Sequence, residues 1–109
     1  MKLIVSIIHG EDAQALLDAL FHKGFQAAAF NAAGYWLHGR NTVVLTGAEE
    51  DRVAEVVALI REVCPVRLQQ SNPLPPVMEP GEIFAPTPTE TEIGGATVFV
   101  LDAEQFFQF

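Results

Sequence analysis

The sequence predicts a single α+β domain in which strands and helices follow the order β-α-β-β-α-β. Apolar runs near both ends of the chain, within residues 3–8 and 91–101, are typical of strands. Two stretches between them repeat their apolar residues with the helical period, and a glycine turn separates two further short strands. With 109 residues in the chain, we expect residues 1–109 to form one domain.

The N-terminal part predicts a strand and then a helix. Residues 3–8 are almost wholly apolar, which indicates a central strand that is exposed on neither face. From Glu11 the apolar residues repeat with the helical period, and acidic residues occupy the first turn, as the helix dipole prefers. Gly24 suits the C-terminal cap. The apolar face of this helix is expected to consist of Ala13, Leu16, Leu17, Leu20 and Phe21.

A hairpin is predicted next. Residues 25–33 are rich in alanine, but they lie between a helix cap and a glycine turn and have no N-cap of their own, so we predict a strand. Residues 41–46 form its partner. The compact loop over residues 34–40 carries Tyr35 and Trp36, the single tyrosine and the single tryptophan of the chain.

A second helix and a last strand complete the predicted domain. Residues 49–63 begin with three acidic residues and show a helical stripe of Val53, Val56, Val57, Ile60 and Cys64. A proline-punctuated loop follows over residues 66–89, and long loops of this kind are usually functional or disordered. Residues 91–101 form the last strand, which we expect to be buried and central. Gly94 and Gly95 in this strand indicate a bulge, a tight crossing or a close approach to a ligand.

This order of elements is that of the ferredoxin-like fold, an antiparallel sheet with two helices on one face. The other face of the sheet needs cover, and self-association is the simplest solution for a small apolar chain. The C-terminal residues 102–109 contain three phenylalanines, so we expect this tail to dock.

Composition limits the class of function. The chain carries 14 acidic and 6 basic residues, a net charge of −8, which argues against binding to nucleic acid or to anionic membranes. It shows no leader pattern before the first strand and no apolar run of the ~18 residues that a membrane span needs, so we expect a cytoplasmic protein. The one cysteine, Cys64, cannot form an intrachain disulfide and is expected to be a small buried residue.

Few residues have the context of a catalytic or metal site. His9, His22 and His38 lack metal-ligand spacing, and the chain has no phosphate-binding glycine loop. Some small ferredoxin-like proteins are acylphosphatases that use an arginine and an asparagine, but the adjacent Arg40 and Asn41 would face opposite sides of a strand. We therefore expect no enzymatic activity, no cofactor and no metal.

The aromatic pair in the predicted hairpin loop is the strongest candidate for a binding site. Tyr35 and Trp36 either pack in the core or form a surface on which a base or another flat ligand stacks, with Asn41 supplying amide hydrogen bonds. The residues leave both interpretations open.

Several segments follow one known pattern along nearly the whole chain. They are Met1–Val5, Gly34 with Trp36-Leu37, Asn41-Thr42 with Gly47, Gly94–Leu101 and Phe106–Phe109. In these segments the chain resembles the PII-like cyclic-di-AMP receptor family. The resemblance implies a ferredoxin-like homotrimer that binds the dinucleotide in clefts between subunits. It also implies signalling without catalysis, in which ligand-dependent ordering of loops changes the binding of a downstream protein that the sequence does not name.

The resemblance implies ligand contacts at Gln26, Ala28, Trp36, Leu37, Asn41, Gly47, Phe99 and Gln108. Trp36 stands where the family usually has phenylalanine, a reasonable substitute for stacking on adenine. Gln26 stands where the family has arginine, which removes a charged hydrogen bond worth about 1.5–3 kcal/mol. Ala28 replaces a threonine, and Tyr35 and Arg40 each replace a glycine.

Two functions are compatible with these residues. The first is a trimeric receptor that binds cyclic-di-AMP between subunits. The second is an interaction module of the same fold that has lost this ligand and binds another small ligand, or a protein through the proline-rich loop. Gln26→Arg with Ala28→Thr discriminates between them, since binding that appears only after these substitutions favours the second function.

Overall fold

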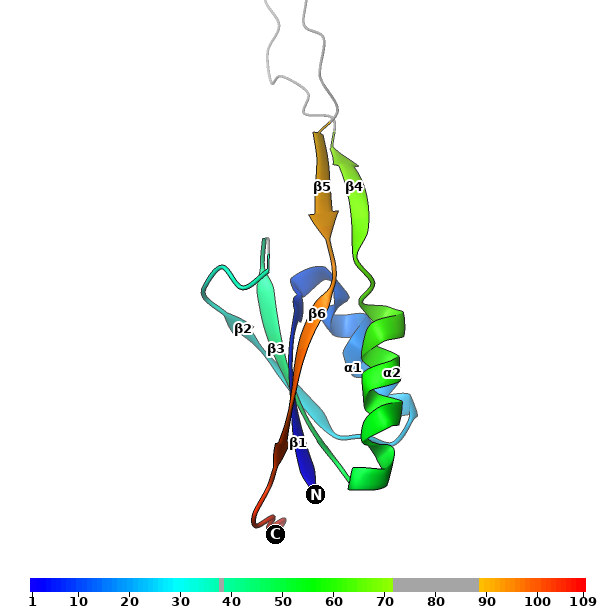
Figure 1. The fold of residues 1–109 in the computed structure, drawn as a ribbon, viewed down its shortest axis with the longest axis vertical. Coiled ribbons are helices and arrows are strands. Elements are labelled where there is room, and N and C mark those ends of the chain that lie inside the picture. The colour runs from blue at the N-terminus through cyan, green and yellow to red at the C-terminus, as the bar shows by residue number, and fades with distance from the viewer. Residues whose placement is uncertain (38, 72–88) are drawn as a thin grey trace, which may run out of the picture.

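A computed structural model describes residues 1–37, 39–71 and 89–109. It contains a four-stranded antiparallel sheet with both helices on one side, and a two-stranded hairpin that projects from one end (Figure 1). The predicted α+β fold with the order β-α-β-β-α-β is confirmed. The hairpin is an addition, inserted between the second helix and the last strand.

The four-stranded sheet has the strand order β2-β3-β1-β6. Its strands are β1 (Lys2–His9), β2 (Ala27–Ala32), β3 (Asn41–Ala48) and β6 (Ala96–Asp102). The helices α1 (Ala13–His22) and α2 (Val53–Val63) each follow a short 3-10 turn, η1 (Gly10–Asp12) and η2 (Glu50–Arg52). The projecting hairpin pairs β4 (Arg67–Ser71) with β5 (Thr89–Ile93). Among the described residues, no helix is long and apolar enough to cross a membrane.

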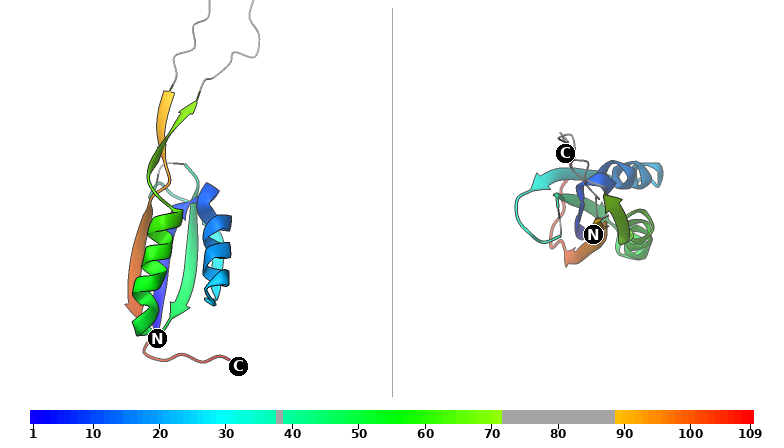
Figure 2. Two further views of the ribbon diagram at one scale, coloured as in Figure 1. Left: turned by 90° about the vertical axis from the view of Figure 1, so that its right-hand side faces the viewer. Right: turned by 90° about the horizontal axis from the view of Figure 1, so that it is seen from above.

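The core lies between the two helices and the face of the sheet that they cover (Figure 2). Its fully buried apolar side chains are Ile4, Ile8, Leu16, Leu20, Val44, Val56 and Ile60. The predicted helical stripes supply Leu16, Leu20, Val56 and Ile60, and the predicted strands supply Ile4, Ile8 and Val44. One residue of the stripe predicted for α1 lies outside the core. Phe21 is 78% exposed, so its expected place on the apolar face of α1 is wrong. The buried face of α1 is centred on Leu16 and Leu20, and Phe21 is turned away from it by the helical rotation of about 100° per residue.

No helix of the described residues covers the opposite face of the sheet (Figure 2). The strand register places mostly apolar side chains on this face. In the register of the sheet, Val5 of β1 lies opposite Leu45 of β3 and Phe99 of β6. Phe99 is 43% exposed, so the expectation that the first and last strands are buried on both faces is wrong for the single chain. We call this surface the open face; it comprises Leu3, Val5, Ile7, Phe30, Val43, Leu45, Phe99 and Leu101.

The single strand predicted over residues 91–101 is two strands. Gly94 and Gly95, both with φ of +84°, separate β5 in the hairpin from β6 in the main sheet. β6 lies at the edge of the sheet, so its expected central position is also wrong. The loop predicted over residues 66–89 begins and ends with strands that the polar sequence of β4 did not indicate; residues 72–88 lie outside the described residues.

Cys64 is buried at the end of α2, as expected. Its burial, with a further contribution from the Asp12 carboxylate, raises the pKa of the thiol from 9.0 to about 11. The thiolate fraction at pH 8 is then about a hundredfold smaller than in an exposed cysteine. We expect iodoacetamide at pH 8 to alkylate the native protein about a hundred times more slowly than the guanidinium-denatured chain. Equal rates would contradict this burial.

Candidate ligand-binding site

The loop between β2 and β3 is held together by Asn41, whose side chain is 4% exposed. Its Oδ1 accepts a hydrogen bond from the backbone N–H of Leu37 at 2.9 Å. Its Nδ2 donates to the carbonyl oxygens of Gly34, Leu37 and Gly39 at 3.2–3.3 Å. The amide that the sequence suggested as a ligand contact is therefore engaged within the loop, and its structural effect is to shape the surface that the loop presents.

Trp36 lies over the open face. Its indole N–H donates to Thr97 Oγ1 at 2.9 Å, and its ring meets the ring of Phe99 at 6.1 Å between centroids and an angle of 64°. The indole is 60% exposed and Tyr35 is fully exposed, so neither aromatic ring of the loop packs in the core. A fixed, half-exposed indole beside a second ring provides a stacking surface. We call Trp36, Leu37, Asn41 and Phe99 the hairpin cluster.

A second group of predicted site residues lies at the opposite end of the sheet. Gln108 Nε2 donates to Gln26 Oε1 at 3.1 Å, which ties the C-terminal tail to the start of β2. Both glutamines and Gly47 line a cavity of about 470 Å³. Ala28 lies two residues further along β2, opposite Leu45 on the open face. We call Gln26, Ala28, Gly47 and Gln108 the tail cluster.

The tail itself docks less fully than the sequence suggested. Gln108 makes the contact with β2, and Phe106 lines the cavity of the tail cluster but stays 55% exposed. Phe107 and Phe109 stack on each other with an interplanar angle of 6°, and both are exposed. The expected docking of the tail is therefore partial in the single chain: it is made by Gln108 and Phe106, and the rings of Phe107 and Phe109 stay exposed.

Arg52 brings a positive charge to the cavity of the tail cluster. Its guanidinium lies 4.0 Å from the centroid of the Phe25 ring and donates to both carboxylate oxygens of Glu55, at 3.1 and 3.2 Å. The hydrogen bond from Arg52 holds the pKa of Glu55 below its ordinary value. No pattern in the sequence marks Arg52 as a site residue, because only the fold brings η2 close to the start of β2.

The predicted site residues therefore form two groups within one chain. Asn41 begins β3, and Gly47 lies six residues further along the same strand. Extended residues rise about 3.3 Å each, so about 20 Å of strand separates the hairpin cluster from the tail cluster.

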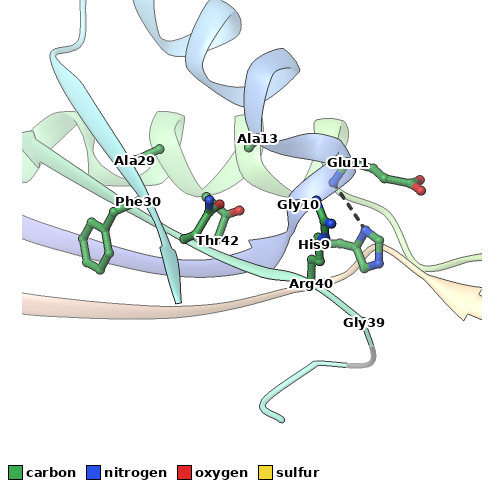
Figure 3. A pocket seen from close by; sticks show the side chains of 10 residues that line it. His9, Gly10, Glu11, Ala13, Ala29, Phe30, Gly39, Arg40 and Thr42 are labelled. Carbon is green, nitrogen blue, oxygen red and sulfur yellow. Dashed lines mark hydrogen bonds between the residues drawn. The ribbon is translucent and has the colours of Figure 1, made fainter. Parts of the chain in front are cut away.

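A second cavity, of about 660 Å³, lies at the same end of the sheet as the hairpin cluster and contains none of the predicted ligand contacts (Figure 3). His9, Glu11, Arg40 and Thr42 are among the residues that line it. Nδ1 of the buried His9 ring accepts a hydrogen bond from the N–H of Glu11 at 3.4 Å, which places the proton of a neutral ring on Nε2. The described residues contain no group of three or more potential metal ligands, and His38 lies outside them.

A small antiparallel sheet with a half-exposed aromatic loop at one end and an amide-lined cavity at the other is suited to binding a small molecule. The model of the family described as "Cyclic-di-AMP receptor" matches residues 1–109, and the chain therefore belongs to the cyclic-di-AMP receptor family. This is a family of signalling receptors and not of enzymes.

A solved structure has the same fold. It is that of a functionally unknown protein from Pediococcus pentosaceus ATCC 25745, to which this chain is similar with 31% identity and a TM-score of 0.75. The similarity covers 99% of this chain and 96% of that one. The family resemblance expected from the sequence is thus confirmed along the whole length.

Proposed function

We propose that this chain is a cytoplasmic cyclic-di-AMP receptor that forms a homotrimer and binds the dinucleotide between subunits. The hairpin cluster of one subunit and the tail cluster of the next form one site. The separation of about 20 Å along β3 carries this proposal, because a ligand held by one chain would have to bridge that distance across the open face. A contact between two different patches closes into a ring when each subunit repeats it.

The clusters offer complementary chemistry to this ligand. Trp36 provides a stacking surface for one adenine. The carboxamides of Gln26 and Gln108 offer the paired donor and acceptor that the edge of an adenine takes. Arg52 supplies a positive charge near the tail cluster for a phosphodiester, although Glu55 neutralises part of it.

The apolar open face supports the trimer. A surface of this kind is stabilised by about 25 cal/mol for each Å² that association removes from water. We expect Val5→Asp, at the centre of the open face, to give monomers, because each subunit would otherwise bury an unpaired carboxylate. Light scattering should find three times the chain mass of 11.9 kDa for the wild type and a single chain mass for Val5→Asp.

The matched control is Phe21→Asp, which adds the same charge at an exposed position on α1 and should leave the trimer intact. A monomeric wild type, or a Val5→Asp variant that remains trimeric, would contradict this assembly.

Isothermal titration with cyclic-di-AMP tests the receptor function, with cyclic-di-GMP and ATP as comparisons. We expect selective binding of about one ligand per subunit, together with a change in the fluorescence of Trp36, the single tryptophan. Trp36→Ala should weaken binding by about tenfold or more, since stacking of a base on an aromatic ring is worth about 1–3 kcal/mol. Trp36→Phe should retain most of the affinity. No heat and no shift in melting temperature at high ligand concentration would refute the receptor function.

The substitutions in the tail cluster favour one alternative, a trimeric interaction module that no longer binds cyclic-di-AMP. Gln26 lacks a charge and Ala28 lacks a hydroxyl at the two positions where the resemblance implies polar contacts. If the wild type does not bind cyclic-di-AMP and Gln26→Arg with Ala28→Thr does, the alternative is supported. If both bind with similar affinity, it is excluded.

A further inference from the structure

The β4 arm of the projecting hairpin is fixed to the domain by a buried carboxylate. Arg67 Nη2 donates to Asp12 Oδ1 at 2.7 Å, and Arg67 Nη1 donates to Asp12 Oδ2 at 3.2 Å. Asp12 is 6% exposed, and Arg67 also donates to the carbonyl oxygen of Pro65 at 3.0 Å. The pairing raises the pKa of Arg67 above its ordinary value. Only the carboxylate is buried, but a bidentate contact to it fixes the direction of the Arg67 side chain more strictly than a single contact between exposed charges does.

The other arm of the hairpin is fixed at the same place. The N–H of Gly95 donates to the carbonyl oxygen of Cys64 at 3.0 Å. The backbone of Gly94 lies against the Pro65 carbonyl and the guanidinium of Arg67, so closely that a Cβ at this position would lie 2.6 Å from Arg67 Nη1. Both arms therefore leave the domain at one closely packed point, formed by Cys64, Pro65, Arg67, Gly94 and Gly95. Beyond it the hairpin projects from the rest of the chain (Figure 1).

Each arm of the projecting β4–β5 hairpin is also connected to the β2–β3 loop, which carries part of the hairpin cluster. The turn η1, which contains Asp12, is bonded to the β2–β3 loop through the N–H of Gly10, which donates to the carbonyl oxygen of Arg40 at 2.9 Å. Figure 3 shows Gly10 and Arg40 side by side. The other arm, β5, leads through Gly94 and Gly95 into β6, where Thr97 accepts the hydrogen bond of the Trp36 indole.

We propose that Asp12, through its ion pair with Arg67, couples ligand binding at the hairpin cluster to the order of the β4–β5 hairpin. The inference rests on the proposed function, since it concerns the regulation of the same ligand site. A ligand that stacks on Trp36 orders the β2–β3 loop, and the Arg40–Gly10 contact carries this ordering to η1. The Asp12–Arg67 pair then orders the root of the hairpin. Asp12 touches no ligand in this scheme and is a positioning residue.

Hydrogen exchange measured by mass spectrometry tests this coupling in the wild type and in Asp12→Asn, with and without cyclic-di-AMP. Asp12→Asn keeps the shape of the side chain but removes the charge that orients Arg67. We expect ligand to slow exchange of residues 67–71 and 89–93 in the wild type. In Asp12→Asn the affinity from titration should stay within about threefold of the wild type, while the ligand-dependent slowing in the hairpin is lost. Without ligand, exchange in these strands should be about tenfold faster than in the wild type.

Two further variants keep the test decisive. Asp18→Asn, at an exposed aspartate of α1, is the matched control and should behave as the wild type. Arg67→Lys retains the charge but loses the bidentate contact. It replaces Asp12→Asn in the exchange experiment if that variant does not fold. A hairpin that responds to ligand equally in Asp12→Asn and in the wild type would overturn the inference.

The outcome separates this inference from the proposed function. A wild type that binds no cyclic-di-AMP would refute the receptor function and, with it, the coupling to this ligand. If the variants bind cyclic-di-AMP normally and the ligand still slows exchange in their β4–β5 hairpin as in the wild type, only the role of Asp12 would be refuted. Unchanged exchange without ligand in Asp12→Asn would show that the ion pair does not fix the hairpin.

Discussion

Gly94→Ala is expected to lower the free energy of unfolding by about 3 kcal/mol or more. The φ of +84° at this residue is costly for alanine, by about 1 kcal/mol. The added methyl would also overlap the carbonyl oxygen of Pro65 and come within 2.6 Å of Arg67 Nη1. Because Arg67 is held by the buried Asp12, relief of this overlap would disturb the ion pair as well, and overpacking of this kind adds about 1–3 kcal/mol.

Gly24→Ala is the matched control for this prediction. Gly24 has nearly the same φ, +83°, but a Cβ at this position would have no atom within 4 Å. Gly24→Ala should therefore lower the free energy of unfolding only by the backbone contribution of about 1 kcal/mol. Guanidinium denaturation of both variants measures the difference. Equal losses of stability would contradict the close packing of Gly94 against Pro65 and Arg67.

Asn41→Ala is expected to lower the affinity for cyclic-di-AMP by about a hundredfold or more and to destabilise the fold by about 2 kcal/mol. One side chain satisfies the N–H of Leu37 and three carbonyl groups of the loop. Its removal leaves these groups to water or unpaired and releases the loop that holds Trp36 over Phe99. A loss of about 2.7 kcal/mol in binding corresponds to a hundredfold change in affinity.

The neighbouring Asn31 of β2 provides a control, because it is an exposed asparagine that lies opposite Thr42 and not within the loop. Asn31→Ala should leave both affinity and stability nearly unchanged. Titration and chemical denaturation of the two variants test the prediction. If Asn41→Ala retained the affinity of the wild type, the shape of the β2–β3 loop would not determine the site.

The elements with strong periodicity were predictable from the sequence, and those that depend on pairing between distant segments were not. The stripe of α2 and the apolar strand β1 follow from local patterns. The polar strand β4 exists because β5 pairs with it, and the break at Gly94 follows from the close approach of Pro65. Burial of the faces of β1 and β6 was overestimated, because an exposed apolar face of a sheet has the same sequence pattern as a buried one.

The resemblance suggested residues for the candidate site but not how they are arranged in space. That Asn41 and Gly47 lie at opposite ends of one strand follows from the observed register of β3. The contacts of Trp36 with Thr97 and of Arg67 with Asp12 join residues more than fifty positions apart in the sequence. No local pattern indicates such contacts, so they required the structure.

The most direct test of the proposed site between subunits is titration of a mixed oligomer. Trp36→Ala disables the hairpin cluster and Gln108→Ala the tail cluster, so trimers of either variant alone should bind cyclic-di-AMP weakly. When the two variants are unfolded together and refolded as an equimolar mixture, about one quarter of the contacts should join an intact hairpin cluster to an intact tail cluster. We expect wild-type affinity at about that fraction of sites. A mixture that binds no better than the separate variants, beside a wild type that binds, would show that each chain contains its own site and would contradict the account.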